Sequence, residues 1–165
     1  MRYAQIRSMD ISNGEGIGVS LFVQGCHFHC KNCFNSETWD FAGGKAWTDS
    51  TEEKFLQLIN RPYIKRVSIL GGEPLADENV ETIYTLINKI KTIYPTKKIW
   101  LYTGYRWTEL EGLKLLTAGL CDVIVDGPYI DELRDPSLLW KGSSNQRVIK
   151  KVIVEAGCYE SNRER

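Results

Sequence analysis

The chain has 165 residues, a length that suits one domain with a substantial buried core. Lysine and arginine together number 21, as do aspartate and glutamate, so the formal net charge is zero. This balance argues against a general nucleic-acid-binding protein, which normally carries a basic excess. The longest uncharged run, residues 16–30, is too short to span a bilayer, and residues 1–5 lack the apolar stretch of a signal peptide. We therefore expect a cytoplasmic protein that contacts no membrane and keeps its five cysteines reduced.

Short apolar runs that end at glycine or proline alternate with helical patterns along the chain. These runs are rich in β-branched and aromatic residues, as is typical of buried parallel strands. Helices are predicted to begin near Ser50, Asp77 and Thr108, where capping residues precede apolar residues at helical spacing. The alternation predicts an α/β fold with a mostly parallel sheet, in which residues 1–155 form a single domain and residues 156–165 a frayed polar tail. In chain order, the predicted strands are 19–23, 67–70, 98–102 and 122–126, with a further edge strand at 148–154.

Four unusual loops follow the first four predicted strands. In a parallel sheet, the loops at the carboxyl ends of the strands form the functional edge, so these loops predict one site. Thr103 and Asp126 are the first residues of two of these loops. For each of them the sequence allows two interpretations, a structural cap of the following turn or a role in the site. The loops are residues 26–33, 71–74, 103–105 and 126–128.

The first of these loops holds three cysteines, Cys26, Cys30 and Cys33, spaced C-x3-C-x2-C. Thiolates this close in sequence can converge on one metal centre, and they favour zinc or an iron–sulfur cluster. A four-iron cluster ordinarily takes four cysteines, so with three of them one iron keeps an open coordination position for chemistry. The alternative is a closed structural zinc site, which needs a fourth ligand. The candidates for that ligand are His27, His29, Cys121 and Cys158.

This cysteine spacing resembles the signature of the radical S-adenosylmethionine (SAM) enzymes, and residues 71–74 match the GGEP loop of that superfamily. The resemblance implies a shortened, open partial (β/α) barrel and a [4Fe-4S] cluster whose unique iron chelates SAM. The two glycines of the GGEP loop would let its backbone approach SAM closely. By resemblance, the cluster ligands are Cys26, Cys30 and Cys33, SAM is placed by Asn32, Cys33, Phe34, Gly71, Gly72, Glu73 and Pro74, and Thr103 and Asp126 contribute to a SAM or small-cation pocket.

Further matches narrow the resemblance to the organic-radical-activating enzymes, in particular those that activate anaerobic ribonucleotide reductase. This resemblance implies an oxidoreductase that uses the cluster and SAM to generate a glycyl radical on the catalytic subunit of the reductase. It also implies an electron donor, such as a flavodoxin, as a second partner. The matching segments are 24–26, 33–35, 38–39, 102–105, 125–127, 135–138 and 142–147.

Two segments depart from the family pattern. Asn32 stands where many relatives have an aromatic residue, so contact with the adenine of SAM would go through the backbone of residues 32–34. Residues 13–18 read N-G-E-G-I-G, without the proline and the arginine of the N-G-P-G-x-R pattern common among relatives. Three alternatives stay open: activation of another glycyl-radical enzyme, a radical SAM reaction on a small molecule, and a zinc-stabilised binding module without catalysis.

Overall fold

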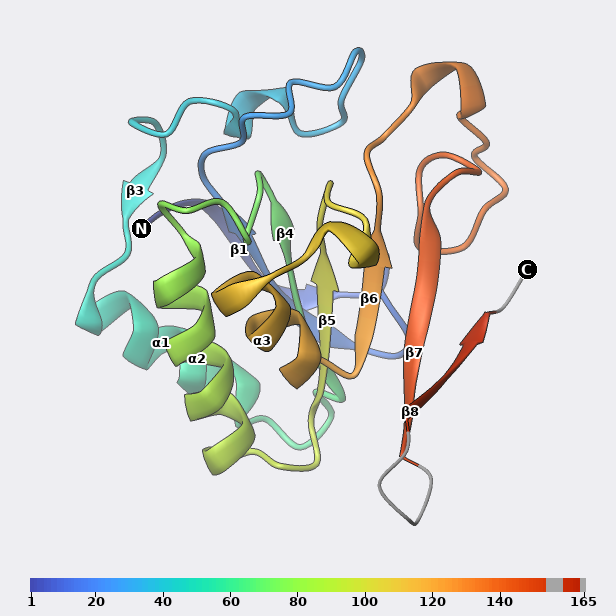
Figure 1. Cartoon of the computed structure of the whole chain (residues 1–165). Helices are drawn as coiled ribbons and strands as arrows, with labels where there is room; N and C mark the ends of the chain where they lie inside the picture. Colours follow the sequence, from blue (N-terminus) through green and yellow to red (C-terminus); the bar gives the residue numbers. More distant parts are fainter. Residues whose placement is uncertain (154–158, 164–165) are drawn as a thin grey trace.

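Eight strands form one open sheet in the computed structural model, which describes residues 1–153 and 159–163 (Figure 1). The strands are β1 (Arg2–Asp10), β2 (Gly18–Val23), β3 (Lys45–Ala46), β4 (Arg66–Gly71), β5 (Lys98–Tyr102), β6 (Val123–Asp126), β7 (Arg147–Ile153) and β8 (Tyr159–Arg163). Their order in the sheet is β3-β1-β2-β4-β5-β6-β7-β8. The central strands β2, β4, β5 and β6 are parallel, whereas the outer strands pair antiparallel. The predicted α/β class with parallel strands at its centre is confirmed.

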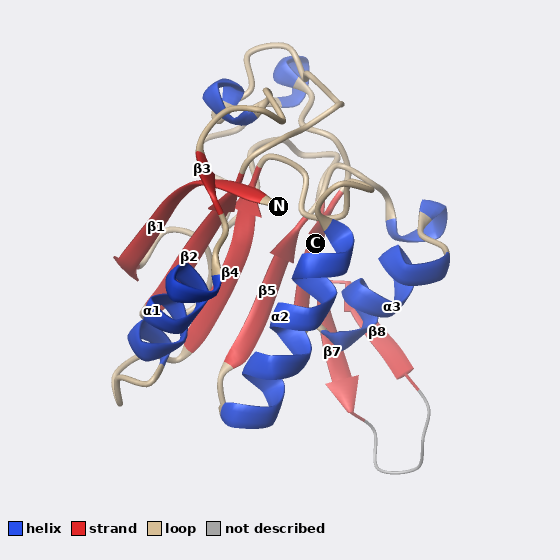
Figure 2. Ribbon diagram, turned by 90° about the vertical axis from the view of Figure 1, so that its left-hand side faces the viewer, coloured by secondary structure: helices blue, strands red, loops and turns tan. Residues whose placement is uncertain are grey.

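The three α-helices lie against the same side of this sheet (Figure 2). They are α1 (Asp49–Ile59), α2 (Val80–Ile93) and α3 (Gly112–Leu120). Every second side chain of the central strands joins them in one apolar core, and we call this side the helix face. The strand residues of this core are Val19, Leu21, Val23, Val67, Ile69, Ile99, Leu101 and Ile124.

The other side of the sheet, which we call the loop face, is covered by loops instead of helices. Trp140 packs edge-on against Trp100 at 5.0 Å, and Ser68 Oγ donates a hydrogen bond to Asn13 O at 2.6 Å. The segments around Asn13 and Trp140 therefore close this face. The alternate positions of the central strands, which point here, are Ser20, Phe22, Arg66, Ser68, Leu70, Trp100, Tyr102, Val123 and Val125.

The predicted helices are present, but all three capping assignments were wrong. Thr48 rather than Ser50 caps α1, because its Oγ1 accepts the Thr51 N–H at 3.2 Å. Asn79 rather than Asp77 is the N-cap of α2. Glu111 rather than Thr108 is the N-cap of α3, and Thr108 lies in a short 3-10 helix. The chain between these elements also forms three short 3-10 helices, η1 (Ser36–Thr38), η2 (Trp107–Glu109) and η3 (Asp131–Leu133).

The C-terminal part differs from the sequence prediction in one respect. The strand predicted at 148–154 is β7, but it is not at the edge, because β8 pairs with it from Ile149↔Arg163 to Ile153↔Tyr159. Residues 159–163 of the expected tail therefore form a strand. Residues 154–158 and 164–165, which include the last residue of the predicted strand 148–154 and Cys158, lie outside the described residues. None of the helices in the described ranges is long and apolar enough to cross a membrane.

Candidate functional site

The cysteine loop, residues 26–33, starts where β2 ends. Gly25 N–H donates to Thr38 O at 2.7 Å, and Cys26 N–H donates to Trp39 O at 3.1 Å. Gly25 has φ +100°, and a Cβ at this position would lie 2.1 Å from Phe41 Cδ1. Only glycine fits this turn, so β2 delivers the loop to the edge of the sheet in one defined direction.

The two glycines of the GGEP loop bring its backbone against the end of β2. Gly72 N–H donates to Val23 O at 2.9 Å, and a Cβ on Gly72 would lie 2.4 Å from Gly25 O. Gly71 has φ +102°, and a Cβ there would lie 2.8 Å from Phe22 Cα. The close approach that these glycines permit is therefore an approach to the base of the cysteine loop. Contact between their backbone and SAM stays a prediction.

Glu73 joins the GGEP loop to the loop after β5. Its buried carboxylate accepts hydrogen bonds from Leu75 N–H at 2.9 Å, Thr103 Oγ1 at 2.8 Å and Gly104 N–H at 2.8 Å. Its own N–H donates to Gly25 O at 2.8 Å. Burial raises the pKa of Glu73 to about 7, although the three hydrogen bonds and Lys114 act in the opposite direction. Glu73 and Thr103 thus hold three loops together, and direct contact of either with SAM stays a prediction. Pro74, next in the chain, is buried.

The three thiols are partly buried at the surface of the cysteine loop. Cys33 N–H donates to Cys30 O at 3.1 Å, which closes a turn, and Asn35 N–H lies 3.4 Å from Cys33 Sγ. Burial raises the pKa of the Cys26 thiol to about 11. A bound metal would have to stabilise the thiolate, because the protein around Cys26 favours the neutral thiol.

The described side chains are not preassembled around a single metal ion, and ligation of a cluster by Cys26, Cys30 and Cys33 stays a prediction. In the ranges 1–153 and 159–163, no three His, Cys, Asp or Glu side chains are grouped so that they could hold one metal ion. Zinc would need its thiolates about 4 Å apart, since Zn–S bonds are about 2.3 Å long. In a four-iron cluster each cysteine binds a different iron, so the sulfurs lie further apart.

The candidate fourth zinc ligands that the structure describes make other contacts. His29 stacks on Trp39 with ring centroids 4.4 Å apart, and His27 Nε2 lies 3.2 Å from Tyr105 Oη. Cys121 is buried in the helix-face core, where its Sγ lies 3.5 Å from Thr117 O. Packing therefore accounts for Cys121, and stacking and a hydrogen bond for the two histidines.

A clamp joins the cysteine loop to η3 and the residues around it. Asn32 Nδ2 donates to Asp131 Oδ2 at 2.8 Å, and Asn32 has a left-handed φ of 55°. The Phe34 ring lies under the Arg134 guanidinium at 5.3 Å. The Asn32 side chain is thus directed to η3, and contact of its backbone with the adenine of SAM stays a prediction. The clamp consists of Lys31, Asn32 and Phe34 on one side and Tyr129, Asp131, Glu132 and Arg134 on the other.

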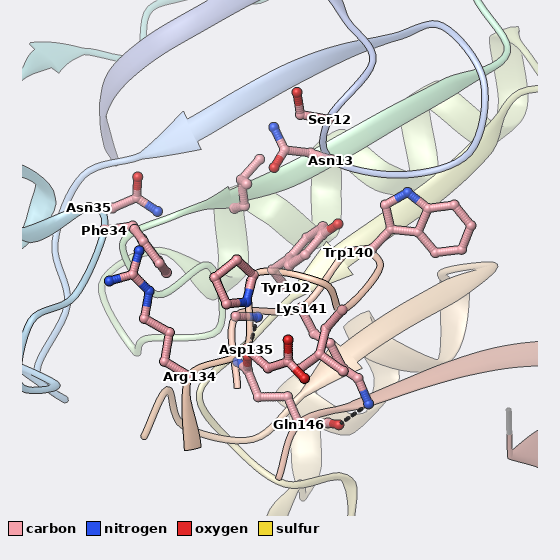
Figure 3. A pocket seen from close by; sticks show the side chains of 14 residues that line it. Ser12, Asn13, Phe34, Asn35, Tyr102, Arg134, Asp135, Trp140, Lys141 and Gln146 are labelled. Carbon is pink, nitrogen blue, oxygen red and sulfur yellow. Dashed lines mark hydrogen bonds between the residues drawn. The ribbon is translucent and has the colours of Figure 1, made fainter. Parts of the chain in front are cut away.

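A pocket of about 430 Å³ lies on the loop face beside the cysteine loop (Figure 3). Leu70 and Tyr102, the floor of this pocket, immediately precede the GGEP loop and Thr103. The Tyr102 hydroxyl is buried and has no hydrogen-bond partner in the described part of the chain, and burial raises its pKa. The hydroxyl is therefore neutral. The remaining lining residues are Ser12, Asn13, Phe34, Asn35, Arg134, Asp135, Pro136, Leu138, Trp140, Lys141, Gly142 and Gln146.

Asp126 supports the segment that carries the far wall of the pocket. Its Oδ2 accepts the Trp107 N–H at 2.8 Å, and its Oδ1 accepts Arg147 Nε at 3.0 Å. Gln146 Nε2 in turn donates to Gly127 O at 3.0 Å. These bonds match the structural-cap reading of Asp126, and its contact with SAM or a cation stays a prediction.

Comparison with known proteins identifies the family. A family model described as a 4Fe-4S single cluster domain matches residues 12–149. Proteins named anaerobic ribonucleoside-triphosphate reductase-activating protein from Salmonella typhi and Escherichia coli (strain K12) are each 41% identical over 150 residues, which is 90% of this chain and 97% of theirs. A protein of the same name from Enterobacteria phage T4 is 38% identical over 148 residues, 90% of this chain and 93% of its own. The chain belongs to this family of reductase-activating proteins.

Family membership helps to identify the metal centre, and the structure explains why this chain lacks the arginine of the family's N-G-P-G-x-R pattern. A 4Fe-4S domain agrees with the predicted cluster and gives the zinc alternative no support. Gly18 stands at the arginine position of the N-G-P-G-x-R pattern, and a Cβ on Gly18 would lie 2.5 Å from Arg66 Cγ. The side chain of Arg66, from the neighbouring strand, occupies the space that a residue at position 18 would fill.

Sequence reasoning missed most of the pocket, because its lining residues are scattered along the chain. It also missed Arg66, which directly precedes the predicted strand 67–70. The available signal was the alternation of Arg66 and Ser68 with apolar residues, which marks a strand with one polar face.

Proposed function

We propose that this protein is a radical SAM enzyme that generates a glycyl radical on the catalytic subunit of an anaerobic ribonucleotide reductase. The observation that carries the proposal is its identity with the reductase-activating proteins over 90% of its length. A cysteine loop that borders a pocket at the carboxyl edge of parallel strands supports it. We also infer that the sheet is a shortened, open partial (β/α) barrel, with the helices outside and the pocket on its inner, loop face.

Cys26, Cys30 and Cys33 would hold three irons of a [4Fe-4S] cluster and leave the fourth iron to SAM. The backbone of residues 32–34 and the GGEP loop would place SAM beside it. When bound and reduced by one electron, the cluster and SAM supply the chemistry: SAM is cleaved to methionine and 5′-deoxyadenosine, and a glycine Cα of the partner loses one hydrogen atom. An external donor such as a flavodoxin would deliver that electron.

The chain's own part is to position the reactants and to keep water away from them. Reacting atoms must come within about 3–3.5 Å, so the glycine must enter the protein on a flexible segment of the partner. The pocket offers that entrance, because Phe34 and Asn35, which directly follow Cys33, line it. Leu70 in its floor and Trp140 in its wall are apolar, and Phe34, 61% exposed, lies at its rim.

Label transfer tests the proposal directly. The protein is reconstituted anaerobically with iron and sulfide, reduced, and examined by electron paramagnetic resonance. It is then mixed with SAM and a reductase that carries deuterium at the glycine α-carbon. We expect a reduced [4Fe-4S] signal, a glycyl radical on the reductase and deuterium in 5′-deoxyadenosine.

Other results would contradict the proposal. If SAM is cleaved and a small molecule supplies the hydrogen, the protein is a small-molecule radical SAM enzyme. If the protein binds zinc tightly and gives no cluster signal, it is a binding module. Cys121→Ala is the matched control, because it removes a thiol from the helix-face core and should leave the cluster signal intact.

A further inference from the structure

A fully buried ion pair lies on the loop face behind the pocket. Arg66 and Asp10 have side chains that are each 1% exposed, and Arg66 Nη2 lies 3.2 Å from Asp10 Oδ1. The same Nη2 donates to Asp10 O at 2.7 Å, and Arg66 Nη1 donates to Ser68 Oγ at 2.7 Å. Desolvation makes a buried ion pair a weak source of stability compared with apolar residues of the same size. We therefore looked for a role of this ion pair in positioning the residues around it.

Asp10 and Ser68 hold one wall of the pocket by its backbone. Asp10 Oδ1 accepts the N–H groups of Ser12 at 2.7 Å and Asn13 at 3.0 Å, and Asp10 Oδ2 accepts Asn13 Nδ2 at 2.6 Å. Ser68 Oγ, which accepts from Arg66, donates to Asn13 O at 2.6 Å. Ser12 and Asn13 line the pocket on the side opposite Asp135 and Gln146 (Figure 3). The backbone of this wall is therefore tied at both its N–H groups and its carbonyl to the buried pair.

The strand register places the pair around a glycine. Asp10 is the partner of Gly18 between β1 and β2, and Gly18 is the partner of Arg66 between β2 and β4. A Cβ on Gly18 would lie 2.5 Å from Arg66 Nη1, so the guanidinium crosses over Gly18 to reach Asp10. Gly14 completes the cradle, because a Cβ there would lie 2.8 Å from Arg66 Nε. Two missing side chains thus make room for one arginine.

We propose that Arg66 and Asp10 are positioning residues, which fix the Ser12–Asn13 wall so that the partner's glycine is held in line with the hydrogen-accepting carbon. This inference rests on the proposed function. On this proposal, the wall needs a guanidinium beside Asp10, whether the arginine belongs to β4 or to β2. Because Gly18 lies between the two residues and has no left-handed φ, an arginine at position 18 can fill the same space when position 66 is glycine.

The readout is the number of glycyl radicals formed per SAM cleaved. A loss of stability lowers both quantities together and leaves this ratio unchanged, whereas a displaced wall lets SAM cleavage proceed without transfer. Ser68→Ala removes the link between Arg66 and Asn13 without leaving a charge unpaired, so the protein should fold. We expect its ratio to fall at least threefold. Thr117→Ala, which removes a buried hydroxyl from α3, is the matched control and should keep the wild-type ratio.

The exchange variant tests the position of the guanidinium. Arg66→Gly leaves Asp10 buried and unpaired, and we expect little folded protein or a low ratio. The double variant Gly18→Arg/Arg66→Gly should recover folded protein with a ratio within twofold of the wild type. If the double variant is insoluble or folded but uncoupled, or if Ser68→Ala keeps the wild-type ratio, the proposal is wrong. A wild-type protein that neither cleaves SAM nor forms a glycyl radical would instead overturn the proposed function.

Discussion

The two faces of the sheet are built from the same strands but are filled differently. On the helix face, Leu21 and Ile69 are fully buried among other apolar side chains. On the loop face, Ser20, Ser68 and Arg66 are buried just as completely, at 0%, 0% and 1% exposure. Burial of polar groups is tolerated only where hydrogen bonds replace water, and such bonds have direction. The helix face therefore supplies stability, whereas the loop face supplies a fixed geometry around the pocket.

The largest effect is expected at the edge where the two faces meet. Cys30→Ala should abolish the cluster signal and SAM cleavage, because the loop has no spare thiol; the same holds for Cys26→Ala and Cys33→Ala. Circular dichroism should show a folded protein, since Cys30 is only partly buried. Iron content and 5′-deoxyadenosine formation measure the loss. A Cys30→Ala protein with wild-type activity would remove the basis for the cluster assignment.

A change on the helix face should affect stability alone. Ile69→Ala deletes a fully buried side chain from the apolar core and should lower the free energy of unfolding by about 2–5 kcal/mol. Denaturant unfolding measures this change. The number of glycyl radicals formed per SAM cleaved should stay at the wild-type value, because Ile69 points away from the pocket. A lowered ratio would show that the two faces are not separate in function.

Glu73 should make the protein less stable as the pH rises. Its pKa is raised from 4.5 to about 7 by burial, so between these values the unfolded chain has lost a proton that the folded chain keeps. The contribution of Glu73 to stability is therefore complete below pH 4.5 and falls by about 3 kcal/mol as the pH rises to 7. Glu73→Gln should flatten this dependence in denaturant unfolding between pH 5 and pH 8. An unchanged slope would mean that the Glu73 carboxylate is not buried as described.

Asp10 should show the opposite dependence on the acid side. Burial alone would raise its pKa, but hydrogen bonds from Asn13, Ser20 and Ser12 outweigh it and lower the pKa from 3.8 to about 2. The stabilisation is present above pH 3.8 and is lost as the pH falls through 2, a change of about 2 kcal/mol. Acid unfolding of Ser20→Ala, which lacks one of these bonds, should begin at a higher pH than that of the wild type. If the two acid transitions coincide, Ser20 does not stabilise the ionised Asp10.

The smallest effect is expected at the exposed clamp. Asn32→Gly loses the hydrogen bond to Asp131 but accepts the left-handed φ of 55°, so stability should change by less than about 1 kcal/mol. Asn32→Ala loses the bond and also strains the backbone, and it should be the less stable of the two by about 1 kcal/mol. Thermal unfolding of both variants measures the difference. Equal stabilities would show that φ at Asn32 is not held by the loop.

Features that lie within one short segment could be predicted from the sequence, whereas the arrangement of residues on the loop face could not. The cysteine spacing, the GGEP loop and the central parallel strands each occupy one short segment, and the structure places these loops together as predicted. β1 was missed because its residues, Arg2–Asp10, contain no apolar run. The pocket was missed because it joins Asn13, Tyr102 and Trp140, whose proximity depends on strand register and loop paths. The alternation of Arg66 and Ser68 with apolar residues indicates a polar face, but it does not identify Asp10, 56 positions away, as the partner of Arg66.

The clamp across the cysteine loop has a consequence for the order of assembly on the ribosome. Asn32 and Asp131 are 99 positions apart, and Lys31 and Glu132 are 101 positions apart. Synthesis runs from the N-terminus, so the three thiols emerge long before the residues that hold the loop from the other side. During that interval the clamp cannot cover the thiols. Closure of the clamp is then one of the last steps in the maturation of the nascent chain.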